Sequence, residues 1–431
     1  MLEPTGKTVC IVGLGYVGLP LASAFDEEGL DVIGFDVDES KIAGLSDGRD
    51  PTGEIGDDAV AESTIEFTTT PTPIERADYV IVTVPTPVDN LKNPNLDFVE
   101  SAGRTVGEHL ASGATVVLES TVYPGVTRDV LGPAIEETSG MTQSVDFNMG
   151  YSPERLSPGT DKSLREVIKI VSGDTQETLE DLVSLYGMIV DAGLYRAPTV
   201  ETAEAAKVLE NVQRDVNIAV VNELALICEH MDLDTKEVID AAASKWNFHE
   251  YSPGLVGGHC IPVDPLFLVH GSERAGYSPK LILQAREVNE YMPKHTAELA
   301  LKALNESGKV LRESRLIVLG LAYKPNVGDL RTSEIGGVIT TLDEYGITCD
   351  GYDPLAPAEQ IRQSFGIDPL SEMDFEGADG IVLATPHDAI LDDLDLDAAK
   401  EQLAEDPVFV DVKGVLEMEE VEEAGYAYRK L

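Results

Sequence analysis

The most restrictive feature of this chain lies near its N-terminus, where an apolar segment runs into a glycine-rich turn. Residues 7–12 (KTVCIV) form that segment, and a second apolar run ends at Asp36. Between them, Gly13, Gly15 and Gly18 make a GxGxxG pattern that opens a helix-like stretch. A bare GxGxxG is weak evidence, but strand, turn, helix and acid in this order are typical of a dinucleotide-binding βαβ unit. The alternative is a tight turn that binds no ligand.

The ligand of such a unit can be inferred from its residue types. Glycines let a pyrophosphate reach the N-terminus of the helix, where backbone N–H groups and the helix dipole favour negative charge. The carboxylate of Asp36 can accept hydrogen bonds from the adenosine ribose. Because this carboxylate repels a 2′-phosphate, the pattern favours NAD over NADP.

Two further strands are followed by turns that carry a threonine. Residues 79–84 (YVIVTV) lead to Thr86, and residues 115–118 (TVVL) lead to Thr121. Ligands of open α/β sheets bind at the carboxyl ends of strands, although single threonines at such places are more often turn or cap residues. Another strand near Phe147 ends in a polar turn. The alternation of strands and helices predicts a doubly wound parallel sheet.

From Val200 to about His230 the pattern changes to one long helix without proline or glycine. Lys207, Asn211 and Asp215 are spaced four residues apart, which places them on one helix face. Two interpretations stay open: a solvated polar stripe, or a face beside small alanines that leaves room for a ligand. A helix of this length is also a natural spine between two domains and a candidate dimer interface.

The second half of the chain repeats the pattern of the first. Residues 315–319 run into Gly320, and residues 347–352 reach Asp353 as the earlier strand reaches Asp36. The segment ADYVIV of the first half returns as ADGIVL in the second. We interpret this as an internal repeat of the nucleotide-binding half.

The repeat lacks the GxGxxG pattern and carries Lys324 and Arg331, which offer charge to phosphate, so we expect it to bind a different nucleotide. The fold class that we expect is α/β, with two Rossmann-like doubly wound parallel-sheet domains joined by a long central helix and a helical middle domain. The expected domains are an N-terminal NAD-binding domain (1–199), a central helical domain with a dimer interface and a cysteine loop (200–308), and a C-terminal Rossmann-like domain (309–431).

A glycine-rich loop over residues 254–265 (GLVGGHCIPVDP) places Cys260 among small residues, with Asp264 four positions later. Glycine permits close approach of the backbone, so a thiol on this loop can meet a ligand that lies against the main chain. The alternative is a small buried residue beside a turn, because free cysteine behaves mostly as a small hydrophobe.

Acidic residues dominate the charge: 78 Asp and Glu against 31 Lys and Arg give a net charge of −47, spread along the chain. Such a surface favours a cytoplasmic protein of a salt-loving organism, because salt screens its self-repulsion; an ordinary acidic protein is the alternative. Nucleic acid and anionic membranes are disfavoured as partners, since they attract basic patches. We expect neither a membrane span nor a targeting segment.

The four cysteines, Cys10, Cys228, Cys260 and Cys349, lie far apart and lack metal-ligand spacing. They indicate reduced thiols in a cytosol rather than a disulfide framework. The seven histidines form no HxxxH or similar cluster. We therefore expect no metal site.

Taken together, these motifs resemble the nucleotide-sugar 6-dehydrogenases, the family of UDP-glucose dehydrogenase, over essentially the whole chain. The motifs that carry the resemblance are GLGYVGLPLA with Asp36 and Lys41, Glu119-Ser120-Thr121, Ser152-Pro153-Glu154, Ala206-Lys207 with Asn211, Gly257-Gly258-His259-Cys260 with Asp264, and Tyr323-Lys324-Pro325-Asn326 with Arg331. Any one of them is compatible with chance, but all of them in sequence order are highly specific.

The resemblance implies that a UDP-sugar is oxidised from a C6 alcohol to a carboxylate with two NAD+ and one water, in a homodimer or higher homo-oligomer. The implied NAD-binding residues are Gly13, Gly15, Tyr16, Val17, Gly18, Asp36, Lys41, Thr86, Thr121 and Arg331. The implied substrate-binding residues are Glu154, Arg155, Lys207, Asn211, Tyr251, Ser252, Gly257 and Lys324. The implied catalytic residues are Cys260, Lys207, Asn211, Asp264, Glu154 and Thr121.

The implied catalytic roles follow the order of the reaction. Lys207, Asp264 and an ordered water are candidates for taking the proton of the alcohol. Cys260 attacks the aldehyde, and the thiohemiacetal is oxidised to a thioester, which a water activated by Glu154 or Asp264 cleaves. Lys207 and Asn211 hold the oxyanion that forms at each addition.

Some positions depart from the UDP-glucose branch of the family. His259 and Val263 replace the usual serine and lysine around the cysteine, Pro158 replaces a glutamate, and no arginine stands near Ser244. The segments YSPER, KWNF and GGHC instead resemble the branch that oxidises UDP-N-acetylhexosamines, so the sugar stays open between UDP-glucose and UDP-N-acetylglucosamine.

Two other functions are kept as alternatives. A two-electron dehydrogenase of the β-hydroxyacid type would use Lys207 and Asn211 but would need neither Cys260 nor the second Rossmann-like half. A nucleotide sensor would bind NAD without turnover, and alkylation of Cys260 would then have no consequence.

Overall fold

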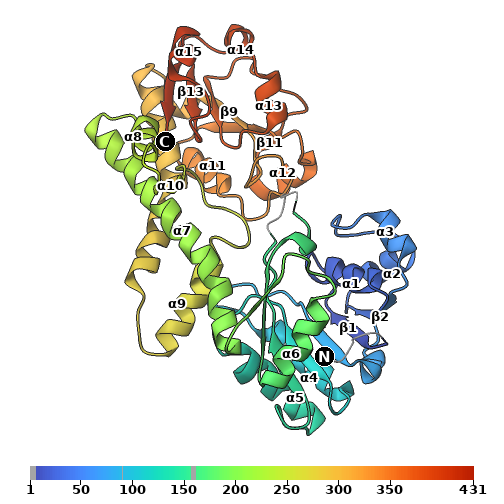
Figure 1. The fold of residues 1–431 in the computed structure, drawn as a ribbon. Helices are drawn as coiled ribbons and strands as arrows, with labels where there is room; N and C mark the ends of the chain where they lie inside the picture. The colour runs from blue at the N-terminus through green and yellow to red at the C-terminus, as the bar shows by residue number, and fades with distance from the viewer. Residues whose placement is uncertain (1–5, 90, 157–161) are drawn as a thin grey trace. The chain divides into compact units, whose positions relative to one another are not determined.

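The computed structural model describes residues 6–89, 91–156 and 162–431, and the chain folds as two compact units. Unit 1 comprises Met1–Glu210 and Val263–Ser278, and unit 2 comprises Asn211–Pro262 and Pro279–Leu431 (Figure 1). The chain passes from unit 1 to unit 2 within the long helix α7 (Val200–Met231), so each unit is built from two chain segments.

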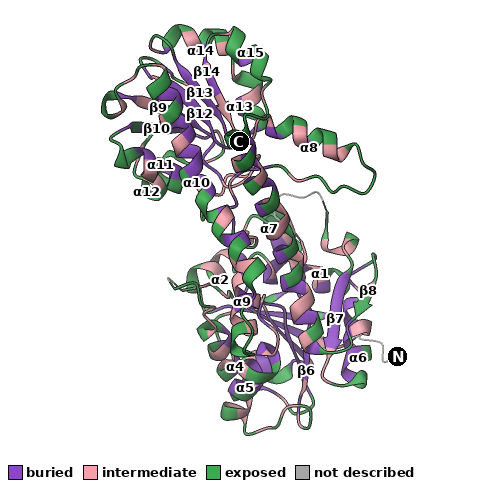
Figure 2. Cartoon of the chain, turned by 90° about the vertical axis from the view of Figure 1, so that its left-hand side faces the viewer, coloured by how far each residue is buried: buried purple, intermediate pink, exposed green. Residues whose placement is uncertain are grey.

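The described part of unit 1 has an eight-stranded sheet with the order β3-β2-β1-β4-β5-β6-β7-β8. Its strands are β1 (Thr8–Val12), β2 (Asp31–Phe35), β3 (Glu66–Thr68), β4 (Tyr79–Val82), β5 (Thr115–Leu118), β6 (Asn148–Tyr151), β7 (Lys169–Gly173) and β8 (Leu194–Arg196). All neighbouring strands are parallel except β6 and β7. Every residue of β4 and β5 is buried, as expected for parallel strands covered on both faces. Figure 2 shows similar burial in the labelled strand β7 of this sheet.

Helices supply that cover. Those of unit 1 are α1 (Gly18–Glu27), α2 (Glu39–Ser46), α3 (Asp57–Glu62), α4 (Asp97–His109), α5 (Gly132–Ser139), α6 (Gln176–Tyr186) and α9 (Asp264–Arg274), with the short helices η1 (Thr72–Arg76), η2 (Thr127–Leu131) and η3 (Leu164–Glu166). Apolar side chains of α1 and α6, including Phe25 and Tyr186, pack with those of β1 into one core. This apolar burial is the dominant favourable term in the stability of the unit.

The described part of unit 2 has a six-stranded parallel sheet with the order β11-β10-β9-β12-β13-β14. Its strands are β9 (Arg315–Leu319), β10 (Thr348–Tyr352), β11 (Asp368–Pro369), β12 (Gly380–Leu383), β13 (Val408–Asp411) and β14 (Ala427–Lys430). Its helices are α8 (Thr235–Ala243), α10 (Lys280–Glu306), η4 (Leu311–Glu313), α11 (Ile335–Glu344), α12 (Ala358–Phe365), α13 (Asp388–Asp393), α14 (Leu396–Gln402) and α15 (Met418–Glu423), with the C-terminal part of α7.

The two sheets confirm the predicted fold class and the internal repeat. The strands β1 to β6 of unit 1 and β9 to β14 of unit 2 lie in the same spatial order, third-second-first-fourth-fifth-sixth. This is the strand order of a doubly wound nucleotide-binding fold. Gly13 and Gly320 donate their N–H groups to the equivalent carbonyls of Phe35 and Tyr352, both at 2.8 Å. The long helix predicted to begin at Val200 ends at Met231. Among the described residues, no helix is long and apolar enough to span a membrane.

Candidate active site and nucleotide sites

The glycine turn of unit 1 is shaped by close backbone contacts. Gly13 has a φ of 98°, which favours glycine, and its carbonyl accepts a hydrogen bond from Thr83 Oγ1 at 2.6 Å. A Cβ at Gly18 would overlap that same carbonyl oxygen. A Cβ at Gly15 would meet nothing within 4 Å, so the turn leaves open space on that side. This arrangement fits a pyrophosphate placed over Gly15 at the start of α1.

Asp36 lies beside this turn, at the end of β2. Its carboxylate accepts hydrogen bonds from the N–H of Leu14 at 2.8 Å and of Asp38 at 3.0 Å, and it pairs with Lys41 Nζ at 2.6 Å. Tyr16, by contrast, is 56 % exposed at the turn, and Val17 precedes the first residue of α1. The structure thus brings the glycines, Asp36 and Lys41 together, as an NAD site requires.

The two predicted threonines meet at the carboxyl edge of the same sheet. Thr86 Oγ1 donates a hydrogen bond to the Thr121 carbonyl at 2.7 Å, and Ser120 Oγ donates to the Val84 carbonyl at 2.6 Å. The turns after β4 and β5 are therefore tied to each other. At least Thr86 has a structural use for its hydroxyl.

The first turns of α7 contact this edge through three side chains spaced three residues apart. Glu204 accepts hydrogen bonds from the N–H groups of Gly125 at 2.5 Å and Thr127 at 2.9 Å, and from Thr127 Oγ1 at 2.6 Å. Burial raises the pKa of Glu204 to about 7, although these hydrogen bonds lower it. Six residues further along α7, Glu210 pairs with Arg155 at 2.6 Å, which fixes the turn after β6.

Lys207 lies between these two contacts and faces Asp264. Its Nζ is 3.9 Å from Asp264 Oδ2, and both residues are buried. Asn211, one helical turn further along α7, and Asp215, one turn beyond it, are buried as well. The interpretation of these positions as a solvated stripe is therefore wrong, because the stripe faces inward.

In unit 2, the buried stripe continues into a network that holds the start of the cysteine loop. Asp215 Oδ1 accepts hydrogen bonds from Arg286 Nη1 at 2.7 Å and Asn289 Nδ2 at 2.8 Å. Asn222 donates to Asn289 Oδ1 at 2.8 Å and to the Gly254 carbonyl at 3.1 Å, and it accepts the Gly254 N–H at 2.8 Å. An amide that both donates to and accepts from one residue fixes the backbone of the loop at that point.

The loop then packs on Tyr323. A Cβ at Gly257 would come within 2.7 Å of the Thr332 carbonyl oxygen, and one at Gly258, whose φ is 91°, within 3.0 Å of the Tyr323 ring. Cys260 is exposed. Burial raises the pKa of the Tyr323 phenol, and the negative charges of Asp329 and Cys260 raise it further. The phenol and the thiol therefore interact electrostatically.

His259, the residue before Cys260, lies beside an ion pair. His259 Nε2 is 3.8 Å from Asp329 Oδ2, and Arg331 forms two hydrogen bonds with the same carboxylate at 2.9 Å. Burial and Arg331 lower the pKa of His259, while Asp329 opposes them. Arg331, predicted to contact NAD, thus lies in unit 2 as the partner of Asp329.

Two further predicted substrate residues lie near the start of this loop. Tyr251 OH accepts a hydrogen bond from Gln213 Nε2 at 3.4 Å, and Ser252 is exposed. The other cysteines are buried, and burial raises the pKa of Cys10 and of Cys349 to about 12. At neutral pH these two thiols stay protonated, so they are poor nucleophiles.

The acid of the second lobe has a structural function. Asp353 Oδ2 accepts the N–H groups of Leu321 at 2.7 Å and Ala322 at 3.0 Å, and it contacts His387 Nε2 at 3.1 Å. His387 Nδ1 accepts the N–H of Asn326 at 2.9 Å, so its proton is assigned to Nε2. This buried pair holds the turn that carries Lys324.

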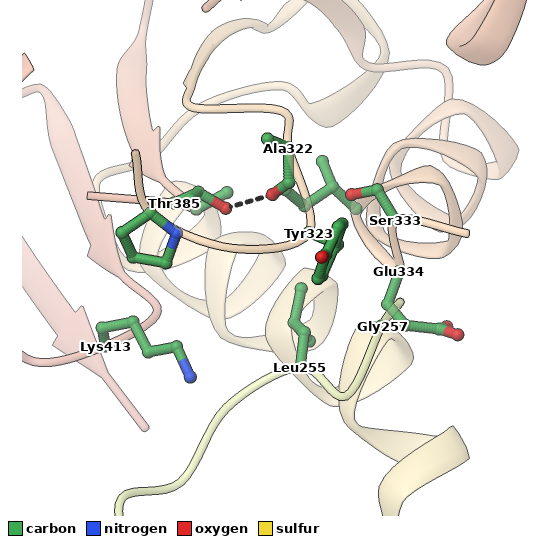
Figure 3. Close-up of a pocket in the computed structure, with 11 residues that line it drawn as sticks. Leu255, Gly257, Ala322, Tyr323, Ser333, Glu334, Thr385 and Lys413 are labelled. Atoms are coloured by element: carbon green, nitrogen blue, oxygen red, sulfur yellow. Dashed lines mark hydrogen bonds between the residues drawn. The ribbon is translucent and has the colours of Figure 1, made fainter. Parts of the chain in front are cut away.

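Lys413, which follows β13, is a candidate that the sequence analysis missed. It lines a pocket of unit 2 together with Leu255, Gly257, Ala322, Tyr323, Pro325, Ser333, Glu334, Ile335, Ala384 and Thr385 (Figure 3). Burial lowers the pKa of Lys413, and it has no ion-pair partner among the residues that the structure describes. A Cβ at Gly254 would overlap its ammonium group. A largely buried cation without a counter-ion, at the rim of such a pocket, suits an anionic ligand.

Glu154 belongs to a cluster that the sequence analysis found only in part. Its Oε1 accepts the N–H groups of Arg155 and Leu156, both at 2.6 Å. Its Oε2 is 3.9 Å from the ammonium group of Lys169, which also pairs with Glu119. Lys169 carries no motif signal, since it begins an otherwise apolar strand. The part of the chain that the structure describes contains no group of His, Cys, Asp or Glu side chains able to hold a metal ion.

Comparisons with known proteins cover almost the whole chain. Three regions match the domain models of the UDP-glucose/GDP-mannose dehydrogenase family: its NAD binding domain (residues 7–190), its central domain (201–291) and its UDP binding domain (317–418).

Individual proteins give the same result. The chain is 43 % identical over 381 residues to the UDP-N-acetyl-D-glucosamine 6-dehydrogenase of Salmonella typhi, covering 88 % of this chain and 89 % of the relative. It is 42 % identical over 382 residues to the enzyme of the same name from Pseudomonas aeruginosa, covering 88 % and 90 %. A solved UDP-D-ManNAc dehydrogenase from Pyrococcus horikoshii superimposes with a TM-score of 0.88 at 29 % identity, covering 98 % and 99 % of the two chains.

Proposed function

Because the chain belongs to the UDP-glucose/GDP-mannose dehydrogenase family, we propose that it oxidises C6 of a UDP-N-acetylhexosamine to a carboxylate. The membership confirms the resemblance and makes the protein an NAD-dependent oxidoreductase of UDP-sugars. The choice of sugar is carried by the relatives at 42–43 % identity, whose names specify UDP-N-acetyl-D-glucosamine. The segments YSPER, KWNF and GGHC support the same choice.

The cofactor site that we propose is the turn of Gly13, Gly15 and Gly18 with Asp36. Its open side at Gly15 and the buried carboxylate at Asp36 fit a dinucleotide. Bound NAD accepts one hydride from C6 in each of two oxidations. The chain's own contribution is to hold the turn rigid through Thr83 and to offer backbone N–H groups to the pyrophosphate.

For the nucleotide of the substrate, we place the negative charge at Lys413. The pocket beside it contains the aromatic ring of Tyr323 and the backbone of Gly257, and it lies entirely in unit 2. Lys324, on the turn held by His387, is the second cation of this lobe that we assign to the substrate. A UDP diphosphate supplies the counter-charge that Lys413 lacks.

The chemistry begins at Lys207 and Asp264. The carboxylate receives the proton of the C6 hydroxyl, directly or through a water, while Lys207 stabilises the alkoxide as the hydride leaves. The Cys260 thiolate then adds to the aldehyde carbon, and Lys207 and Asn211 donate hydrogen bonds to the oxyanion. Loss of a second hydride from the thiohemiacetal carbon gives a thioester on Cys260.

Water completes the reaction. Glu154 or Asp264 takes a proton from water, the hydroxide adds to the thioester carbonyl, and the C–S bond breaks to release the carboxylate and the thiolate. The balance is one alcohol, two NAD+ and one water, giving one carboxylate, two NADH and three protons. The exposed sulfur of Cys260, on a loop that glycines keep small, supports its role as the nucleophile.

NADH formed per UDP-sugar consumed, measured in high potassium chloride, tests this proposal. We expect two NADH per UDP-N-acetylglucosamine and a far lower rate with UDP-glucose. One NADH per sugar would favour the two-electron alternative and leave Cys260 a structural thiol. NAD binding without any turnover would favour the sensor.

Two further proposals concern assembly and location. We propose that the C-terminal part of α7 forms a homodimer interface, because Val220, Ile227 and Met231 expose large apolar side chains there. Light scattering behind size-exclusion chromatography tests it, and a monomer mass at working concentration would exclude it. The acidic surface and the reduced cysteines support a location in the cytoplasm of a salt-loving cell, which cell fractionation tests.

A further inference from the structure

A lysine is buried beside two carboxylates at the edge of the unit 1 sheet. The Lys169 side chain is 2 % exposed, and its Nζ donates a hydrogen bond to Glu119 Oε2 at 3.0 Å. Tyr186 OH donates to the other oxygen of Glu119 at 2.6 Å, and the Lys169 ammonium lies 5.3 Å from the centre of the Tyr186 ring. Burying a lysine is costly unless it is paired, so this arrangement needs an explanation.

The one antiparallel strand pair of the described sheet accounts for its position. Glu119 directly follows β5, and Glu154 lies three residues after β6. Lys169 is the first residue of β7, which runs antiparallel to β6. Because of this reversal, the start of β7 lies at the carboxyl ends of β5 and β6. That edge is where ligands of open α/β sheets bind.

Lys169 contacts the turn of Glu154 in two ways. It donates a second hydrogen bond to the Pro153 carbonyl at 3.2 Å, and this carbonyl precedes Glu154 directly. Its charge is 3.9 Å from Glu154 Oε2. One ammonium therefore fixes the backbone before Glu154 and faces its carboxylate.

Lys169 is the shared cation of Glu119 and Glu154. With Lys169 present, two carboxylates share one cation, and the less buried of the two, Glu154, keeps partial access to solvent. Without it, the turn of Glu154 would lose the contact with its Pro153 carbonyl, and Glu119 would be left as a buried carboxylate without its cation. Glu119 and Tyr186 hold the lysine in place, since both oxygens of Glu119 are engaged.

We propose that Lys169 is a positioning residue for thioester hydrolysis, which fixes the turn of Glu154 and orients its carboxylate toward the attacking water. This inference rests on the proposed function and assigns the hydrolytic base to Glu154 rather than Asp264. We assign Lys169 no direct contact with substrate or cofactor, because Glu119 and the Pro153 carbonyl engage its ammonium group. Its effect is confined to the last step of the reaction, after both hydrides have left.

The test is Lys169→Met, which keeps the length of the side chain and removes its charge. We expect a normal burst of two NADH per site, then a steady-state rate lowered about 100-fold, as a misplaced group typically costs. Acid quench and intact-protein mass spectrometry should show the acyl group on Cys260.

A wild-type hydrolysis rate in folded Lys169→Met would overturn the inference, and so would loss of the NADH burst, which indicates general damage to the site. If this variant does not fold, Glu119→Gln/Lys169→Met removes the buried pair as a unit and should fold while still accumulating the thioester. Lys309→Met is the matched control, since it breaks the Lys309–Asp379 pair at 3.0 Å in unit 2 and should leave hydrolysis unchanged. Failure of the proposed function itself appears separately, as one or no NADH per sugar in the wild type.

Discussion

Replacing Lys413 by Met should weaken UDP binding and at the same time stabilise the ligand-free protein. Lys413 has no ion-pair partner among the described residues, and its side chain extends toward Leu255 in the pocket of Figure 3. A hydrogen bond to a charged group contributes about 1.5–3 kcal/mol. At about 1.4 kcal/mol for each factor of ten, the Kd of UDP should rise about 10- to 150-fold.

The effect on stability has the opposite sign. Burial lowers the pKa of Lys413, so at alkaline pH the unfolded chain binds more protons at this position than the folded chain. The free energy of unfolding therefore rises with pH, from the folded-state pKa up to the unfolded value of about 10.4, and the charged lysine is a burden at neutral pH. Without UDP, the Met variant should show a higher Tm at pH 7. Its free energy of unfolding should also rise less with pH than that of the wild type.

Calorimetry with UDP in high potassium chloride separates the two effects. Wild-type binding at alkaline pH should take up protons, because the diphosphate restores the charged form of Lys413, and the uptake appears as a dependence of the binding enthalpy on the buffer. Lys413→Met should show no such uptake from this group. Unchanged affinity for UDP in Lys413→Met, or a Tm below that of the wild type, would refute the reasoning.

Three further predictions test other parts of the two sites. Gly18→Ala should abolish measurable NAD binding in a fluorescence titration, because the added methyl group overlaps the Gly13 carbonyl; unchanged affinity would disprove this account of the turn. Iodoacetamide at pH 7.5 should label Cys260 well before Cys10, whose pKa burial raises to about 12, and peptide mapping of the modified protein reads the order directly. Asn222→Ala should lower the rate of the NADH burst by more than tenfold with little change in the Kd of UDP, since it frees the start of the cysteine loop; equal losses in both would point to unfolding.

Local patterns were enough to predict the fold and to single out the residues that the proposed mechanism uses. The run from residue 7 to Asp36 and its repeat from residue 315 to Asp353 each alternate as βαβ units do, and the sheets have that order. The boundaries of β5 and β9 agree with the prediction because buried parallel strands are short apolar runs between polar turns. The pairing of Lys207 with Asp264 was not predictable, since 57 residues of sequence separate them and no local rule joins them.

The residues that were missed share a physical cause. Lys169 is at a sheet edge only because β7 runs against its neighbour, and strand direction cannot be read from an apolar run of five residues. Lys413 follows a strand and belongs to no motif. Its distinguishing feature is that it has no counter-ion among the described residues, and only the folded structure shows this. Both are buried cations, and their surroundings become visible only in the folded structure: Lys169 is paired with Glu119, whereas Lys413 has no counter-ion among the described residues.

The acid at the end of the second strand shows how one topology serves two nucleotides. In unit 1, Asp36 accepts the N–H groups of Leu14 and Asp38 and pairs with Lys41, and the turn stays open at Gly15. In unit 2, Asp353 accepts two N–H groups of the corresponding turn and the contact of His387, so its hydrogen-bonding capacity is taken up inside the lobe. Burial opposes this arrangement, yet the hydrogen bonds still lower the pKa of Asp353, which keeps the carboxylate charged for its structural use. A lobe whose acid is occupied in this way cannot offer it to a ribose. Its nucleotide must instead be bound by cations that lie elsewhere, and Lys413 at the end of the fifth strand is such a group.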